Sequence, residues 1–188
     1  MRILITLAVC LSFFGKSYSN EQESTPLIYY SPYCHQLTAF ECTGSEIELE
    51  DGSVWEVNPT DSHKIFLFSS KDPLVIYPVK NIFSSYNYKV KNLSNKESES
   101  SEFIEINIKK ASIDTLNSLK IASLDLENSE VMLSDESVWK INQWDTNHRD
   151  WFVGDFVLVG LNDPGIFSSE KFILINTDVK DYIRVNPR

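Results

Sequence analysis

Apolar and polar residues alternate through much of this chain. The segments Ile47–Leu49 and Trp55–Val57 place apolar residues at every second position, and Asp51-Gly52 lies between them. A period of two is typical of a strand with one buried face, and Asp-Gly is a favoured hairpin turn. The pattern therefore predicts a β-hairpin over residues 47–57.

The same pattern returns in the second half of the chain. Val131–Leu133 and Trp139–Ile141 alternate in the same way, and Asp135-Glu136 lies between them. Glu136 stands where the first half has Gly52, and a residue with a Cβ disfavours a positive φ. We therefore expect the second turn to be longer, or of type I, rather than the mirror-image type that Asp-Gly favours.

The two halves match over a long stretch. Residues 45–92 align with residues 129–176 at a fixed spacing of 84 positions without a gap, and 17 of the 48 positions are identical. Such self-similarity indicates two copies of one unit of domain size. Further short apolar runs at intervals of about ten residues predict five or six strands per copy. The sequence thus predicts an all-β fold, a tandem duplication of a small SH3-like or OB-like β-barrel with at most one short helix between the units.

The repeat also sets the expected boundaries. We expect a first barrel over 34–110, a linker over 111–120 and a second barrel over 121–188. Ser112–Leu119 has apolar residues three apart behind a candidate cap, which favours a short helix there. Residues 20–33 are polar and then rich in proline and tyrosine, so a disordered or extended segment is expected.

One turn differs between the copies. Gly154-Asp155 leads into a buried strand of the second copy, whereas the corresponding stretch of the first copy is Ser69–Asp72. We therefore expect the turn of the first copy to be built differently.

The N-terminus has the pattern of a secretory signal. Arg2 precedes an apolar run from Ile3 to Phe14, and small residues follow up to Ser19. Such a run is too short to span a bilayer, so residues 1–19 are predicted to be a signal peptide that is removed. The alternative is a lipoprotein signal with Cys10 as the acylated residue, which the bulky Val9 before it disfavours. The sequence predicts an exported protein, periplasmic or secreted, with no transmembrane segment in the mature chain.

The charge excludes one class of partner. The chain has 17 Lys and Arg against 27 Asp and Glu, a net charge of −10. Removing residues 1–19 takes away Arg2 and Lys16, which leaves 15 positive against 27 negative side chains and a net charge of −12. Phosphate backbones repel such a surface, so no nucleic-acid partner is expected.

Two cysteines remain after the predicted cleavage, Cys34 and Cys42. An even pair in an oxidising compartment predicts a disulfide bond. The alternative is a metal-binding or nucleophilic site at Cys34-His35, for which the sequence shows no further ligand or base.

The tryptophans fall into two classes. Trp55 and Trp139 occupy equivalent strand positions, which predicts core packing. Trp144 and Trp151 have no aromatic counterpart in the first copy, where threonine and leucine stand. They are candidate ligand-binding residues for a peptide or a glycan. The alternative is a loop packed onto the barrel.

Acidic residues gather near these two tryptophans. Asp145, Asp150 and Asp155 lie close to His148 in sequence. Converging carboxylates can hold a cation or perform acid–base catalysis. The spacing of a calcium loop is absent, however, and turn formation is the favoured role. No short catalytic, cofactor or metal motif is present, so no cofactor and no metal are expected.

The repeated pattern Ile/Val-x-Leu-x-Asp-x-Ser-Val-Trp-x-Val/Ile, followed in the second copy by Trp151-x-x-Gly154-Asp155-x-Val157, resembles uncharacterised exported proteins of intracellular, chlamydia-like bacteria. The likeness covers both copies and consists mainly of strand and turn residues. The resemblance implies export and a β fold, and it brings no activity or active-site residues with it.

These observations favour a non-catalytic binding or structural module. It would recognise a protein, a peptide or a glycan in the bacterial envelope or outside the cell, through Trp144, Trp151 and the neighbouring acids. The alternative is a hydrolase that acts on an envelope polymer through the carboxylates of the second copy.

Overall fold

The computed structural model describes residues 33–79, 84–96, 102–113, 118–162 and 169–188. The predicted signal peptide with Cys10, and the N-terminal segment up to residue 32, lie outside these residues.

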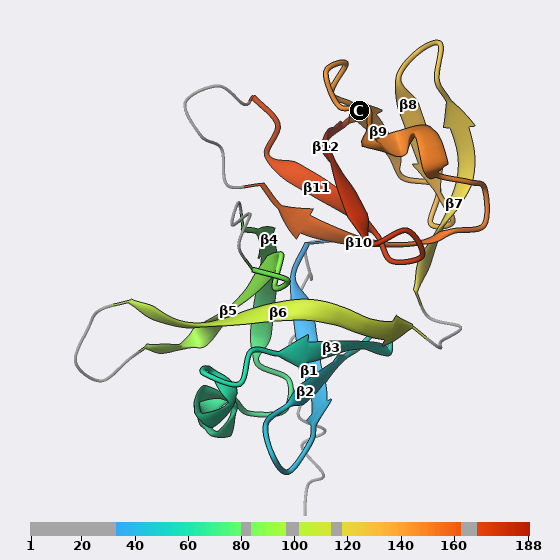
Figure 1. Cartoon of the computed structure of the whole chain (residues 1–188). Coiled ribbons are helices and arrows are strands. Elements are labelled where there is room, and N and C mark those ends of the chain that lie inside the picture. The colour runs from blue at the N-terminus through green and yellow to red at the C-terminus, as the bar shows by residue number, and fades with distance from the viewer. Residues whose placement is uncertain (1–32, 80–83, 97–101, 114–117, 163–168) are drawn as a thin grey trace, which may run out of the picture.

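The described residues of the first half form a closed barrel of six antiparallel strands (Figure 1). The barrel order is β1-β2-β3-β6-β5-β4, and β4 pairs back with β1. A 3-10 helix, η1 (Ser62–Leu67), connects β3 to β4. The strands are β1 (His35–Phe40), β2 (Glu46–Leu49), β3 (Ser53–Val57), β4 (Pro73–Pro78), β5 (Tyr88–Lys96) and β6 (Phe103–Ile113).

The second half repeats this topology. Its barrel order is β7-β8-β9-β12-β11-β10, closed between β10 and β7, with the 3-10 helix η2 (Asn147–Asp150) after β9. The strands are β7 (Leu119–Asp125), β8 (Glu130–Leu133), β9 (Val138–Ile141), β10 (Phe156–Leu161), β11 (Phe172–Asn176) and β12 (Asp181–Pro187). The predicted all-β fold of two tandem small barrels is therefore confirmed.

The helical segments lie inside the two units. Strand β6 continues to Ile113 and β7 begins at Leu119, so the helix expected over 112–119 is absent from residues 112, 113, 118 and 119, while 114–117 lie outside the described residues. Within the described ranges, no helix has the length and apolar character needed to cross a membrane.

Apolar residues at alternate positions of the strands fill the cores of both barrels. In β2 and β3 the inward residues Ile47, Leu49, Trp55 and Val57 are buried, while their neighbours are half-buried or exposed. The corresponding residues of β8 and β9 are buried in the same order. Closing each sheet on itself hides the strand edges that an open sheet would leave unpaired.

The turns between β2 and β3 and between β8 and β9 have the same structure. Gly52 has a φ of 81° and donates its N–H to the carbonyl of Leu49, while Glu136 has a φ of 67° and donates to the carbonyl of Leu133. Neither turn is of the mirror-image type, because the central residues Glu50-Asp51 and Ser134-Asp135 have no positive φ. The expected difference between the two turns is absent, since Glu136 adopts the positive φ that a Cβ disfavours. The carboxylate of Asp135 accepts the N–H of Ser137 at 3.0 Å and stabilises the turn despite the left-handed conformation of Glu136, which costs about 1–2 kcal/mol.

The turns before β4 and β10 are also alike, which corrects a second expectation. Lys71 (φ 72°) takes the place of Gly154 (φ 100°), and the next residues, Asp72 and Asp155, are 83 positions apart instead of 84. Each of these carboxylates accepts a backbone N–H three residues earlier in the chain. The gapless alignment is out of register here by one position, since six residues separate Asp61 from Phe68 and five separate Asp145 from Trp151.

The predicted disulfide is absent, because Cys34 and Cys42 are both free. Cys34 precedes β1 and Cys42 follows it. A strand of six residues extends about 20 Å, whereas a disulfide requires Cα atoms within about 7 Å. Burial, followed by the charge of Glu50, raises the pKa of the Cys34 thiol, which makes it a poorer nucleophile than an ordinary cysteine.

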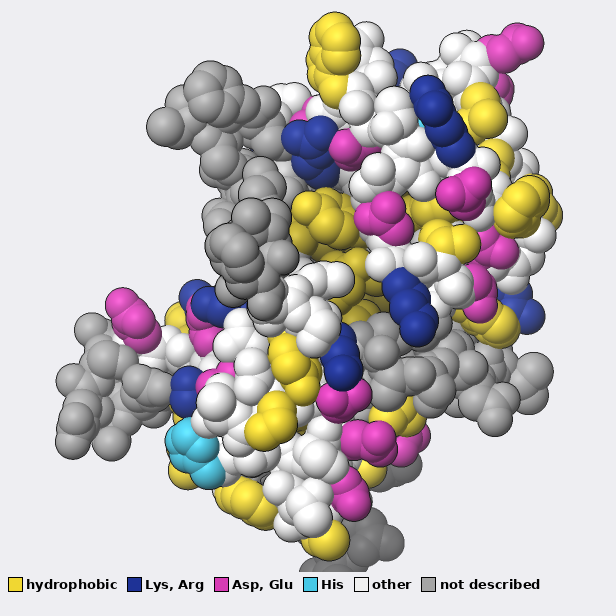
Figure 2. Space-filling model, in the orientation of Figure 1, with side chains coloured by type: hydrophobic (Ala, Val, Ile, Leu, Met, Phe, Trp, Pro, Cys, Tyr) yellow, Lys and Arg dark blue, Asp and Glu magenta, His cyan; other side chains and the backbone are white. Residues whose placement is uncertain are grey.

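The two barrels pack against each other through β10, β11 and β12 (Figure 1). Leu158, Ile173 and Ile175 point out of the second barrel and belong to the same hydrophobic cluster as the core of the first barrel. Gly160 lies at the closest approach: an added Cβ would stand 2.7 Å from the carbonyl oxygen of Ile76. Figure 2 shows hydrophobic side chains at this junction and charged side chains of both signs over the outer surface.

A buried histidine links the barrels. His35 is 5% exposed, and its two ring nitrogens lie 2.8 Å from Glu50 Oε1 in the first barrel and 2.8 Å from the carbonyl oxygen of Val159 in the second. Both partners are acceptors, so the doubly protonated ring can donate to both. Burial alone lowers the pKa of His35, but the hydrogen bond and charge of Glu50, with the carbonyl of Val159, outweigh it and raise the pKa above 6.5.

This link makes stability depend on pH. The raised pKa of His35 contributes stability that is complete below about pH 6.5 and is lost as the pH rises through the pKa of the folded state. Between pH 5.5 and pH 8.5 we expect the free energy of unfolding to fall by about 1 kcal/mol more in the wild type than in His35→Gln. This amount is the difference between a charge-assisted and a neutral hydrogen bond. Urea unfolding at both pH values measures this loss, and equal losses in the two proteins would contradict it.

Candidate binding site

The two tryptophans predicted to form a binding surface lie in different environments. Trp144 is 78% exposed in the turn before η2, whereas Trp151 is 3% exposed and belongs to the core of the second barrel. Trp151 is the residue that caps η2, as the buried Phe68 caps η1, so its counterpart is Phe68 instead of Leu67. Trp144 and Trp151 therefore do not form one exposed aromatic surface.

Two of the three predicted carboxylates, Asp145 and Asp155, have structural partners. Asp145 accepts two hydrogen bonds at 2.7 Å from Arg184, one from its backbone N–H and one from its guanidinium. Asp155 accepts the side-chain amide of Asn176 at 2.7 Å. Asp150 is exposed at the end of η2. These contacts attach η2 and the turn before β10 to the barrel wall.

The first barrel repeats these contacts. Asp61 accepts the backbone and side-chain N–H groups of Asn107, and Asp72 accepts the side-chain amide of Asn92. The shared arrangement indicates that the duplicated carboxylates hold the connections in both barrels. Among the described residues, no three His, Cys, Asp or Glu side chains gather into a metal-binding group.

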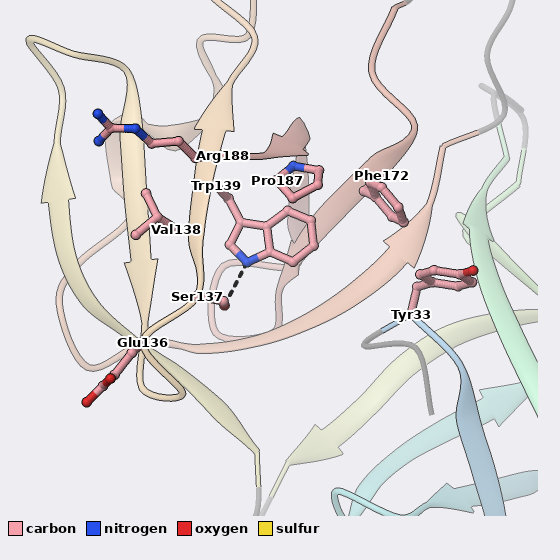
Figure 3. Close-up of a pocket in the computed structure, with 8 residues that line it drawn as sticks. All are labelled: Tyr33, Glu136, Ser137, Val138, Trp139, Phe172, Pro187 and Arg188. Atoms are coloured by element: carbon pink, nitrogen blue, oxygen red, sulfur yellow. Dashed lines mark hydrogen bonds between the residues drawn. The ribbon is translucent and has the colours of Figure 1, made fainter. Parts of the chain in front are cut away.

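A different site opens at one side of the second barrel. We call it the Trp139 pocket, a cavity of about 630 Å³ (Figure 3). Its walls come from β9, β11, the end of β12 and the segment that precedes β1. It is lined by Tyr33, Glu136, Ser137, Val138, Trp139, Phe172, Pro187 and Arg188.

Three aromatic rings form the apolar wall of the Trp139 pocket. The ring centroids of Trp139 and Phe172 are 5.6 Å apart with planes at 73°, an edge-to-face contact, and Tyr33 lies 5.2 Å from Phe172 at 41°. Figure 3 shows Phe172 beside Pro187, with Trp139 on one side of Phe172 and Tyr33 on the other. The indole N–H of Trp139 donates to Ser137 Oγ at 2.9 Å, so its polar atom already has a partner.

The rim of the Trp139 pocket is polar. The Arg188 guanidinium donates to the Glu130 carboxylate at 2.9 Å, and the Arg188 backbone N–H donates to the carbonyl of Val138. The Glu136 side chain is exposed and extends outward (Figure 3). An apolar cavity of a few hundred cubic ångströms with a few polar groups at its mouth is the usual form of a ligand site.

The sequence did not indicate this pocket. Trp139 was predicted to be a core residue, and it is 3% exposed, but one side of its ring faces the cavity. Tyr33 was placed in a disordered or extended segment, and no pattern in the sequence connects it with Phe172. The equivalence of Phe172 with Tyr88 was the one available signal that this position carries an aromatic ring in both copies.

The wall of the Trp139 pocket is thus assembled from segments more than a hundred residues apart. Comparison of the chain with protein-family models, with curated proteins and with solved structures finds no match.

Proposed function

We propose that this chain is an exported, non-catalytic binding module whose second barrel holds an apolar group of a protein, peptide or glycan partner in the Trp139 pocket. The observation that carries the proposal is the row of three aromatic rings, Tyr33, Trp139 and Phe172, along a cavity of about 630 Å³.

The construction of the Trp139 pocket supports binding. Two of its rings come from strands of a closed barrel, and the ring of Tyr33 packs against one of them. Rings held by packing lose little conformational freedom when a ligand arrives, which lowers the entropic cost of association. Large aromatic side chains also supply most of the energy at known interaction sites.

The surroundings of the acidic residues support a role without catalysis. Asp145 and Asp155, the best candidates for acid–base chemistry, are occupied by Arg184 and by Asn176. Export follows from the secretory pattern of residues 1–19, and the excess of acidic side chains favours partners other than nucleic acid.

A binding screen tests this function. The intact chain is probed with a displayed peptide library and a glycan array, side by side with Phe172→Ala, which removes a wall of the pocket, and Trp144→Ala, which removes exposed aromatic surface elsewhere. We expect to find ligands that bind Trp144→Ala as they bind the wild type and that do not bind Phe172→Ala. Circular dichroism confirms that both variants fold. Ligands that depend on Trp144 instead, or no ligand in either library, would overturn the proposal.

A further inference from the structure

The residues that lead into β1 are attached to the second barrel at two neighbouring points. The ring of Tyr33 packs on Phe172 of β11, with centroids 5.2 Å apart, and lines the Trp139 pocket (Figure 3). Two residues later, Nε2 of His35 lies 2.8 Å from the carbonyl oxygen of Val159 in β10. Strands β10 and β11 are neighbours in the second barrel. One wall of the pocket and the buried histidine therefore belong to the same short segment.

The hydrogen bond to Val159 requires a doubly protonated ring. Nδ1 of His35 lies 2.8 Å from Glu50 Oε1, and Nε2 faces the carbonyl of Val159. A neutral imidazole has one N–H and one lone pair. Because a hydrogen bond to the charged carboxylate is the stronger one, the neutral ring keeps its N–H on Nδ1. The lone pair of Nε2 then faces the lone pairs of the carbonyl oxygen, so loss of the proton breaks the attachment to β10.

Two carboxylates act on the imidazole, and both belong to the turn between β2 and β3. Glu50 accepts a hydrogen bond from the ring, and the charge of Asp51 also favours the protonated form. The neighbouring Cys34 stays a neutral thiol, since burial and then the charge of Glu50 raise its pKa. The residues on the adjoining strands β4, β7 and β10 are apolar or are charged residues with partners of their own: Leu74, Leu119, Val157, Leu158, Val159, Asp72 (bonded to Asn92) and Lys120 (over the ring of Phe156).

The junction leaves room for the ring to move. A cavity of about 310 Å³ lies beside His35, between the turn at Glu50 and β10. Water has space there to hydrate the carbonyl of Val159 once the ring turns away. The apolar contacts of Leu158, Ile173 and Ile175 with the core of the first barrel do not depend on this proton. We therefore expect the barrels to stay packed while the segment before β1 loosens.

We infer that His35 is a pH-dependent latch that holds Tyr33 in the wall of the Trp139 pocket, closed when the imidazole is protonated and open when it is neutral. The inference rests on the proposed function and names the regulation of that site. Two attachments two residues apart support each other, since each keeps the other close to its partner. When the bond to Val159 is lost, Tyr33 leaves Phe172 more often and the pocket loses a wall.

The latch is closed in acidic solution. Burial disfavours the charged ring of His35, but the hydrogen bond and charge of Glu50 outweigh it and raise the pKa above 6.5. A raised pKa keeps the bond to Val159 complete below about pH 6.5 and loses it as the pH rises through the pKa of the folded protein. Loss of one charge-assisted hydrogen bond changes an equilibrium by about fivefold.

Nuclear magnetic resonance of the Tyr33 ring protons tests the latch in the intact chain. The ring current of Phe172 shifts these resonances, and Phe172→Ala gives their position without the contact. Between pH 5.5 and pH 8.5 we expect the wild-type resonances to move toward that position, as detached Tyr33 becomes about fivefold more frequent. In His35→Gln, which keeps His63 and His148, they should stay in place. Resonances that do not move in the wild type, or that move equally in His35→Gln, overturn the inference.

Glu50→Gln tests the same latch with the imidazole retained. The new amide can donate to Nδ1, so the neutral ring can carry its proton on Nε2 and still donate to the carbonyl of Val159. We expect Tyr33 to remain on Phe172 at pH 8.5 in this variant. Detachment at pH 8.5 to the extent seen in the wild type overturns the inference.

Binding of anilinonaphthalene sulfonate, an apolar fluorescent dye whose charge is constant in this range, connects the latch to the pocket. Between pH 5.5 and pH 8.5 we expect its affinity to fall by up to about fivefold more for the wild type than for His35→Gln. Equal falls, with binding that Phe172→Ala abolishes, overturn the inference and leave the proposed function standing. Absence of binding, or binding that Phe172→Ala leaves unchanged, overturns the proposed function and the inference with it.

Discussion

Replacing Trp55 with alanine is expected to lower the free energy of unfolding by about 3–5 kcal/mol, the usual cost of removing a buried tryptophan. Trp55 is 0% exposed at the centre of the first barrel, in contact with Tyr88 and hydrogen-bonded to Ser53. The truncation leaves a cavity that the surrounding strands, paired on both sides, cannot close. Urea unfolding followed by far-ultraviolet circular dichroism measures the loss.

The matched control is Trp144→Ala. Trp144 is 78% exposed, so its removal should change the free energy of unfolding by no more than about 0.5 kcal/mol. Similar losses in the two variants would mean that Trp55 does not fill the core of the first barrel.

Gly160→Ala is expected to disturb the junction between the barrels. The added Cβ would stand 2.7 Å from the carbonyl oxygen of Ile76 and 2.9 Å from the side chain of Ile173, and a backbone carbonyl has little room to move. Crowding of this kind costs about 1–3 kcal/mol. We expect lower stability together with a larger radius of gyration, measured by urea unfolding and small-angle X-ray scattering.

Gly154→Ala provides the control for this substitution. An added Cβ at Gly154 meets no atom within 4 Å, but its φ of 100° strains any other residue. That variant should lose stability through backbone strain alone and keep the radius of gyration of the wild type. An unchanged radius in Gly160→Ala would show that the barrels are not packed as described.

The architecture could be predicted from the sequence because the geometry of a strand depends on neighbouring residues only. Successive side chains of a strand point to opposite faces, so the alternation around Ile47 and Val131 reports burial directly. The spacing of the repeat then indicated two units, and two barrels with the same strand order are what the structure contains.

Predictions failed where distant contacts or backbone strain decide the outcome. The cysteines are close in sequence, but β1 holds them apart. Glu136 adopts the same positive φ as Gly52 although its Cβ disfavours that conformation, because the hydrogen bonds of the hairpin hold it there. Trp151 was assigned an exposed role from an alignment that is one residue out of register near η2, and it fills the core instead.

The candidate site was the part of the structure that the sequence predicted least well. The Trp139 pocket depends on Tyr33, more than a hundred residues away from Trp139, and on how the barrels pack. Neither is encoded in a local pattern. The sequence singled out Trp144 and Trp151 because they differ between the copies, whereas the pocket uses residues that the copies share.

The most direct measurement is nuclear magnetic resonance of the tryptophan indole N–H groups during titration of the intact chain with a ligand obtained from the binding screen. The indole N–H of Trp139 is bonded to Ser137 beside the cavity, whereas Trp55 is enclosed in the first barrel and Trp144 lies in solvent. A ligand in the pocket should shift the Trp139 resonance in proportion to occupancy and leave those of Trp55 and Trp144 in place. A shift confined to Trp144, or no shift at a saturating concentration of the ligand, would contradict the account.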